Sequence, residues 1–313
     1  MYHAANQESR RPEPPLRPPD APAVNVDTTA PRWLWLSLPI VVLAMGASIT
    51  SLAVDGIYAQ ETENWAAQAV GQDVANLVAY ATMAVLALLA SRGSLSAYLG
   101  WLGTLVYSAY TYTIYAFSIQ LGPLFLVYVT VLGLSVYALV GGMSSLEPDR
   151  VRAAFSERTP TTVTGGLLVA IGASFYLLWL SEAVPAMLAD GTPELLREVG
   201  LPTNPVHVLD MGLLLPAALL AGVLLIKRRP WGYLLAPAIL SGITLLGVGI
   251  IAVVAVAVFR DITTGWGVAV GIGALVVVQL VVLGRFLESP GPDANLADTL
   301  RGRAEPIAPA GAP

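Results

Sequence analysis

The 313-residue sequence contains no cysteine, only two histidines and a single lysine, Lys227. The absence of cysteine excludes disulfides, thiolate metal sites, iron–sulfur ligation and cysteine nucleophiles. Because Lys227 lies in a cationic cluster outside the apolar runs, no span can form a retinal Schiff base. One histidine, His3, lies in a polar tail, which leaves His207 alone among apolar segments and argues against a multi-histidine zinc hydrolase. We expect no cofactor and no metal.

Sequence motifs for several other enzyme classes are also missing. The strings H-E-x-x-H and G-x-S-x-G do not occur, and no glycine-rich phosphate-binding loop is present. No basic patch with interleaved aromatic residues is found either, which argues against nucleic-acid binding. An enzyme built from carboxylates and His207 is the third and weakest of the functional hypotheses below.

Charge is scarce and hydrophobicity is high. Charged residues make up 12% of the chain and hydrophobic residues 56%, and the mean hydropathy is +0.69. The apolar residues come in runs of roughly 20, the length that crosses a bilayer as a helix. We therefore predict an all-α polytopic transmembrane helix bundle with lipid as its main partner. About eight spans are expected: Trp33–Val54, Gln72–Ala90, Leu95–Ile119, Leu124–Met143, Gly166–Leu188, Val206–Ile226, Tyr233–Phe259 and Trp266–Leu287.

The positions of basic residues predict the orientation of the bundle. Lys and Arg that flank spans are retained on the cytoplasmic side. With both termini in the cytoplasm, only Arg197 and Arg260 fall outside. The cytoplasmic group then comprises Arg10, Arg11, Arg17, Arg32, Arg92, Arg150, Arg152, Arg158, Lys227, Arg228, Arg229, Arg285, Arg301 and Arg303.

The two ends of the chain differ in composition from the apolar middle. Residues 1–32 are rich in proline and arginine, and residues 288–313 are polar and rich in proline and alanine. Such segments bury too little apolar surface to fold alone. We predict disordered cytoplasmic tails at 1–32 and 288–313, with the membrane bundle between them at 33–287.

Four ionisable residues within the predicted spans are candidates for function, because charge inside a bilayer is costly. Asp73 opens the second span, Glu182 lies near the end of the fifth, and His207 and Asp210 lie in the first turn of the sixth. All four are expected within roughly 10 Å of the outer boundary. Their convergence across helices would create a polar pocket in the outer leaflet, formed mainly by the second, third, fifth and sixth spans.

Neutral polar residues extend this candidate pocket. Asp73, Asn76 and Tyr80 share one helix face by their i, i+3, i+7 spacing, and Tyr107, Thr111 and Tyr115 follow one side of the third span. Structural alternatives remain open for several of these residues. Asp73 and Asp210 could cap helix N-termini, His207 could contact lipid headgroups, and the tyrosines could form an outer aromatic belt. Glu182 is expected to be protonated or to have a partner.

Two further patterns in the last span concern helix contacts. Gly267 and Gly271 form a small-xxx-small pattern that permits close approach of another helix, either within the bundle or in a homo-oligomer. Gln279 is a neutral polar residue that could bond across helices, and we assign it no chemistry.

Two stretches, "LVYSAYTYTIYAFSIQLGPLFLVYVTVLGLS" and "VHVLDMGLLLPAALLAGVLLIKRRPWGYLLAP", resemble segments of uncharacterised multi-pass membrane proteins of bacteria. The resemblance covers about a fifth of the chain. It implies a location in the bacterial plasma membrane and carries no activity that could be transferred.

Three functional hypotheses follow. The preferred one is binding of a small molecule or ion, for sensing or transport, with the acidic residues holding a proton or a small polar or cationic ligand. The second is a structural or assembly subunit, whose polar residues only bond helices together. The third is the membrane enzyme, which requires a nucleophile or metal beside Glu182 or His207.

Overall fold

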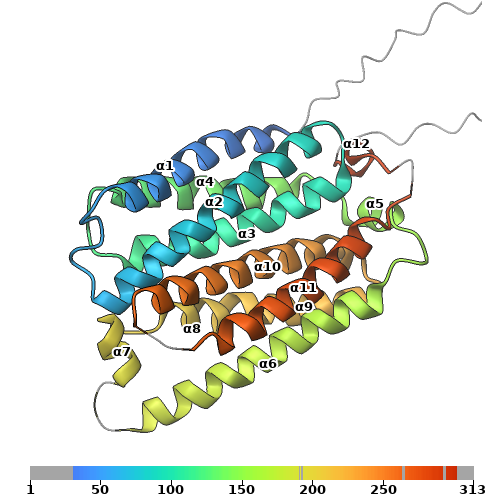
Figure 1. Cartoon of the computed structure of the whole chain (residues 1–313). Helices are drawn as coiled ribbons and strands as arrows, with labels where there is room; N and C mark the ends of the chain where they lie inside the picture. The colour runs from blue at the N-terminus through green and yellow to red at the C-terminus, as the bar shows by residue number, and fades with distance from the viewer. Residues whose placement is uncertain (1–30, 190, 192, 263–264, 292–293, 302–313) are drawn as a thin grey trace, which may run out of the picture.

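The structure is a computed structural model that describes residues 31–189, 191, 193–262, 265–291 and 294–301. These residues form a bundle of helices with no β-strand, only isolated bridges, which confirms the predicted all-α class (Figure 1). The elements are η1 (Arg32–Leu36), α1 (Ser37–Ala53), α2 (Glu63–Ser91), α3 (Leu95–Ser118), α4 (Phe125–Ser144), α5 (Pro148–Ala153), α6 (Thr161–Leu188), α7 (Glu194–Val199), α8 (Pro205–Leu209), η2 (Asp210–Leu214), α9 (Leu215–Ile226), α10 (Pro230–Phe259), α11 (Gly267–Leu287) and α12 (Leu296–Thr299).

Seven stretches of helix in the described residues are long and apolar enough to cross a membrane. They are Arg32–Ala53, Glu63–Ser91, Phe125–Ser144, Thr161–Leu188, Pro205–Ile226, Pro230–Phe259 and Gly267–Leu287. Large apolar side chains such as Leu38, Val78 and Val270 are exposed on their outer faces. Exposed apolar surface on this scale is typical of contact with lipid. The chain is therefore a multi-pass membrane protein.

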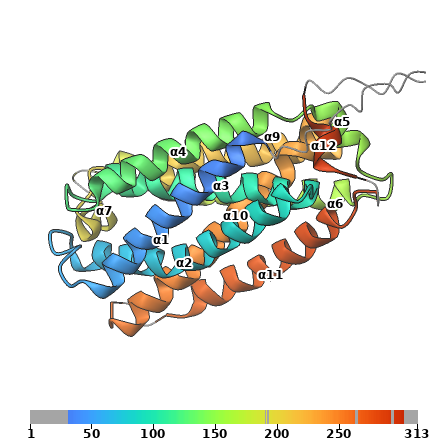
Figure 2. The ribbon, with the colours of Figure 1, turned by 90° about the horizontal axis from the view of Figure 1, so that it is seen from above.

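The remaining predicted span, 95–119, coincides with α3, a helix of 24 residues. Its tyrosines, threonines and serines are spread among the apolar residues, and α3 is not one of the seven helices that are long and apolar enough to cross a membrane. The reason is its place in the bundle, because α3 packs against α2, α4 and α10 and is buried along most of its length (Figure 2). A helix shielded from lipid can carry polar side chains that meet other helices. The count of eight spans stays a prediction.

The bundle has two groups of helices that meet along α10. In Figure 1, α1 to α4 lie together above α6 and α9 to α11, and α10 packs against α2 and α3 across this boundary. Small residues permit the close contact. A Cβ atom at Gly71 would lie 2.4 Å from Val253 Cα, and one at Gly103 would lie 2.5 Å from the Ala238 carbonyl oxygen. Backbones approach closely only where such side chains are absent.

The start of α2 differs from the sequence prediction. The helix begins at Glu63 rather than Gln72, and the Thr62 hydroxyl caps it by accepting a hydrogen bond of 3.3 Å from the Trp65 amide. Asp73 therefore lies about 15 Å along the helix from its first residue, at 1.5 Å per residue. Its predicted alternative role as an N-cap is wrong.

The two ends of the bundle differ in charge. We call them the α7 end and the α12 end after the short helices that lie there in Figure 1. Among the described residues, the basic side chains from the predicted cytoplasmic group gather at the α12 end, whereas Arg197 of α7 and Arg260 after α10 lie at the α7 end. The sequence grouping of basic residues thus corresponds to one physical end of the molecule.

The C-terminal segment at the α12 end corrects part of the predicted tail. Residues 288–291 and 294–301 are ordered against the helix ends rather than disordered. Leu296 N donates to Gly93 O at 2.9 Å, Glu147 N donates to Thr299 O at 2.8 Å, and Arg301 N donates to Ser145 O at 2.9 Å. The rest of that predicted tail, and residues 1–30 of the N-terminal one, lie outside the described residues.

The glycine pair of α11 makes no close helix contact within the bundle. A Cβ atom at either Gly267 or Gly271 would have no other atom of the described residues within 4 Å. Packing inside the bundle therefore does not explain this pattern, and a role in a homo-oligomer stays a prediction.

The contact between α3 and α10 leads to a stability test with a matched control. We expect Gly103→Ala to destabilise the protein by about 1–3 kcal/mol, because the added methyl group meets α10 backbone and Ser241. Gly133→Ala in α4 has open space around the new Cβ, so it should leave stability unchanged or raise it slightly through helix propensity. Thermal unfolding of both purified variants in one detergent checks this. Equal melting temperatures would contradict the described packing.

Candidate functional site

A cavity of about 680 Å³ lies in the bundle between α6 and α11. Residues of α2, α3, α6, α8 to α11 and η2 line it, and we call it the α6–α11 cavity. Most of the lining is apolar, including Ile243, Leu246 and Ile272, and a few polar groups converge on it. This size and composition are typical of sites for small molecules. The second, third, fifth and sixth predicted spans all contribute to this lining, but α10 and α11 contribute as well and most of the lining is apolar. The predicted polar pocket in the outer leaflet stays a prediction.

Asp210 reaches this cavity from an irregular turn of helix. Residues Asp210–Leu214 form a π-helical turn in which Leu215 N donates to the Asp210 carbonyl. Pro216 follows directly, and a proline inside a helix lacks an N–H donor and clashes with the carbonyl four residues earlier. The proline thus accounts for the wider turn, and π-turns of this kind are frequent at functional sites.

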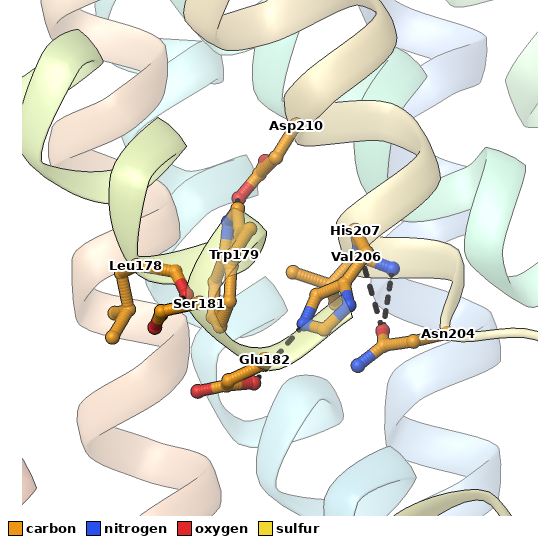
Figure 3. Close-up of polar contacts among 8 residues, drawn as sticks. All are labelled: Leu178, Trp179, Ser181, Glu182, Asn204, Val206, His207 and Asp210. Carbon is orange, nitrogen blue, oxygen red and sulfur yellow. Dashed lines mark hydrogen bonds and ion pairs between the residues drawn. The ribbon is translucent and has the colours of Figure 1, made fainter. Parts of the chain in front are cut away.

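The carboxylate of Asp210 is held by two neutral donors from different helices. Tyr110 Oη of α3 donates to Oδ1 at 2.9 Å, and Trp179 Nε1 of α6 donates to Oδ2 at 2.7 Å. Figure 3 shows the Trp179 indole pointing at this carboxylate. Asn204, rather than Asp210, caps the helix by accepting from the Val206 amide at 2.9 Å. The predicted capping alternative for Asp210 is therefore wrong.

Glu182 and His207 form a second contact beside Trp179. His207 Nε2 lies 3.4 Å from Glu182 Oε2 (Figure 3), and the His207 and Trp179 rings are in contact, with centroids 4.5 Å apart and planes tilted by 39°. The Glu182 side chain is 45% exposed, whereas that of His207 is 12% exposed. Glu182 lines the α6–α11 cavity. The His207 imidazole is thus the group at ion-pair distance from Glu182, although His207 Nε2 has no hydrogen-bond partner among the described residues.

Asp73 belongs to a separate cluster. Tyr58, in the loop before α2, donates to Asp73 Oδ2 at 2.6 Å, and Tyr115 of α3 donates to Oδ1 at 2.9 Å. Burial and the neighbouring Asp73 carboxylate raise the pKa of the Tyr58 phenol above its ordinary value of 10.0, so Tyr58 remains an O–H donor at neutral pH. Asp73 is only 2% exposed. Both of its carboxylate oxygens accept hydrogen bonds from protein side chains, as expected for a residue that stabilises the fold.

Of the other predicted polar residues of α2 and α3, Asn76 and Tyr107 are also bonded to protein groups, whereas the Thr111 hydroxyl has no hydrogen-bond partner among the described residues. Tyr107 Oη donates to Asn76 Oδ1 at 2.7 Å and accepts from Gln72 Nε2 at 2.6 Å. Asn76 Nδ2 donates to Ser48 Oγ at 3.1 Å. These bonds join α1, α2 and α3.

Tyr80 extends the polar contacts toward α4. Its hydroxyl lies 2.8 Å from Ser108 Oγ, which in turn lies 2.8 Å from Ser135 Oγ. Tyr80, Tyr107, Tyr112 and Tyr115 are buried, and their rings pack edge to face or tilted, with the Tyr80 and Tyr107 centroids 6.4 Å apart. The predicted outer aromatic belt is therefore wrong for these tyrosines, which belong to the core.

The structure thus divides the predicted pocket residues. Thr111, Tyr115, Glu182 and Asp210 line the α6–α11 cavity. Asp73, Asn76, Tyr80, Tyr107 and His207 do not appear in its lining. Glu182 and His207 approach each other, and Trp179 joins them to Asp210, but Asp73 bonds to other partners. Three of the four ionisable residues therefore lie around Trp179, and Asp73 lies in a different set of contacts.

Gln279 is, with Thr111, one of two residues in the described lining that have a buried side-chain oxygen without a hydrogen-bond partner. It is 1% exposed, lines the cavity from α11, and its Oε1 atom has no hydrogen-bond partner among the described residues. The predicted bond across helices is not made by this oxygen. Leaving a buried acceptor unpaired costs about 1–3 kcal/mol. A molecule in the cavity that donates a hydrogen bond would remove this cost.

Three residues of the site were not predicted from sequence. Trp179 lies three residues before Glu182 and therefore on the same side of α6, and this spacing could have found it. Tyr110 belongs to the tyrosine-rich stretch of α3 but not to the helix face of Tyr107, Thr111 and Tyr115, from which the pocket was predicted. Gln72 was placed at the start of a span, where a polar residue needs no explanation, whereas α2 in fact begins nine residues earlier.

The Asp73 cluster can be tested through Tyr115. We expect Tyr115→Phe to destabilise the protein by about 1–3 kcal/mol, because it removes a donor from a buried carboxylate. Tyr137→Phe is the control, since Tyr137 is 69% exposed on α4. The free energy of unfolding in one detergent measures both. An equal effect of the two substitutions would contradict the assigned bond.

Comparison with protein-family models, with curated proteins and with solved structures finds no match for this chain. No family or activity is therefore transferred to it. The function has to be argued from the α6–α11 cavity and the residues that surround it.

Proposed function

We propose that this protein binds a small amphipathic molecule in the α6–α11 cavity, for sensing or transport. The observation that carries the proposal is a cavity of about 680 Å³ with a largely apolar wall and a few convergent polar groups, Glu182, Asp210 and Gln279. An apolar wall favours the hydrocarbon part of a ligand, and the polar groups fix its orientation. A ligand of this kind partitions into lipid, which surrounds the helices that form the cavity.

The proposal includes a location and an orientation. Basic residues are retained on the cytoplasmic side of a membrane, so the α12 end lies in the cytoplasm with both termini. The α7 end then faces outward, and Glu182, near the end of α6, lies on that side. With α3 as the eighth span, the protein is a multi-pass protein of the bacterial plasma membrane.

A structural or assembly role is the second candidate, and the bonds of Asp73 favour it. Asp73 and Asn76 are buried and bonded to side chains of the same chain. Such bonds hold helices together without a ligand. A structural role does not explain the unpaired Gln279 oxygen or the apolar cavity. For this reason we prefer ligand binding. The enzyme hypothesis gains no support from the contacts of Glu182 and His207.

Filling the cavity should block binding. Gly271 lines the cavity and has open space around its Cβ position, so Gly271→Phe should place a phenyl ring there without disturbing the backbone. We expect the affinity for a neutral probe, 1-naphthylmethanol, to fall at least tenfold, a loss of about 1.4 kcal/mol. Equilibrium dialysis against protein in lipid nanodiscs measures the affinity, and empty nanodiscs give the background.

Gly284→Phe is the matched control for that variant. Gly284 lies on the same helix, also has open space around its Cβ position, and is not part of the cavity lining. Its substitution should leave probe binding unchanged. Absence of binding above the empty-nanodisc background in the wild-type protein, or equal binding by the two variants, would refute the proposed site.

A further inference from the structure

The charges that line the α6–α11 cavity are of one sign. Glu182 and Asp210 are the carboxylic acids of the lining, and no Lys or Arg belongs to it among the described residues. His207 contacts Glu182, but it can balance at most one of the two carboxylates. The lining therefore carries a negative charge when both acids are ionised, whichever state His207 adopts.

The bonds of Asp210 support the carboxylate without neutralising it. Each of its oxygens accepts a hydrogen bond from a neutral donor, Tyr110 Oη or Trp179 Nε1. Neutral donors stabilise an ionised carboxylate but supply no positive charge. A buried charge without a counter-charge is costly, and a cationic ligand would provide one.

The aromatic donors of the cavity are already used, whereas acceptors are free. Trp65 Nε1 donates to Ser118 O, and Tyr115 Oη donates to Asp73 Oδ1, in addition to the two donors that hold Asp210. In contrast, two side-chain oxygens of the lining have no hydrogen-bond partner among the described residues: the Thr111 hydroxyl, which can donate or accept, and Gln279 Oε1, which can only accept. This acceptor lies on a different helix from both acids and is independent evidence for a ligand that donates hydrogen bonds.

Aromatic rings complete the site. Trp179 lies between Asp210 and the Glu182–His207 pair in Figure 3, and Phe175 lines the cavity one turn earlier on α6. The faces of such rings attract cations, most strongly where water is excluded. Acids, free acceptors and aromatic faces are thus brought together on one apolar cavity.

We propose that the ligand is a lipophilic organic amine, bound as its ammonium form, with the charge beside Asp210 and Glu182 and the apolar body along α10 and α11. This inference rests on the proposed function and narrows it to one class of ligand. It excludes fatty acids and other amphipathic anions, because their carboxylates would face Glu182 and Asp210 and would leave Gln279 unpaired.

Three probes of matched size separate the ligand classes: 1-naphthylmethylamine, 1-naphthylmethanol and 1-naphthoate. In wild-type protein in zwitterionic nanodiscs at neutral pH, we expect the ammonium probe to bind at least tenfold more tightly than the alcohol. The carboxylate should bind most weakly. Equilibrium dialysis with empty nanodiscs as background measures all three. A carboxylate that binds as tightly as the amine overturns the inference.

Two variants locate the source of this preference. Asp210→Asn should reduce the preference for amine over alcohol about tenfold while alcohol binding stays within twofold of wild type. Asp73→Asn is the control, because Asp73 is a buried acid that does not line the cavity, and it should keep the preference. If Asp210→Asn fails to fold, Glu182→Gln replaces it, since the Glu182 side chain is 45% exposed, and it should also lower the preference. A preference unchanged in the folded variant overturns the inference.

Failure of this inference is distinguishable from failure of the proposed function. If the alcohol binds and Gly271→Phe blocks it, but the amine binds no better, the cavity is a ligand site of different chemistry. If no probe binds above background, the proposed function itself fails.

Discussion

The structure depends on one constraint, which is that polar side chains inside a lipid-exposed bundle must be bonded by other protein groups. Water is not available in the membrane core to do this. Much of this bonding is supplied by α3, which is shielded from lipid by α2, α4 and α10. Its hydroxyl groups reach outward to several helices. Tyr115 bonds Asp73 and Tyr110 bonds Asp210, so a single helix holds two buried carboxylates.

The same constraint gives the α6–α11 cavity its chemistry. Because α3 and α6 use their donors on Asp210, the cavity retains negative charge and loses its aromatic donors. The side formed by α10 and α11 is apolar apart from Gln279, whose oxygen has no partner among the described residues. Two carboxylates and an unpaired acceptor, with no Lys or Arg in the described lining, make the site complementary to a cation with N–H groups. The polar core and the proposed ligand class are therefore two consequences of the same arrangement of hydrogen bonds.

Much of the fold could be predicted from the sequence, because lipid contact requires long apolar runs. The predicted ends at Leu188, Ile226, Phe259 and Leu287 are the ends of helices in the structure. The start of α2 could not be predicted in this way, since Asn64, Gln68 and Gln72 are polar residues of a helix that continues beyond its apolar part. The polar composition of α3 is visible in the sequence, but its central place in the bundle is not, because that place depends on packing. Hydropathy indicates which segments contact lipid, but it does not indicate which helix is surrounded by the others.

The candidate site was less predictable, because it depends on contacts between distant segments. Spacing along a helix predicted that Asp73 and Asn76 lie on one face. It could not predict that Tyr58 bonds Asp73 and that Ser48 bonds Asn76. Asp210 was identified by its charge, whereas its donors come from residues 100 and 31 positions away, Tyr110 and Trp179. The importance of Gln279 comes from a missing partner, which no sequence pattern reports.

The bond between α3 and the cavity acid is the contact through which the polar core shapes the site. A double-mutant cycle with Tyr110→Phe and Asp210→Asn measures it directly, using the free energy of unfolding of the four proteins in one detergent. The expected coupling energy is about 1–3 kcal/mol in favour of the native pair. A coupling energy near zero would contradict the account, because Tyr110 would then not hold Asp210 at the cavity.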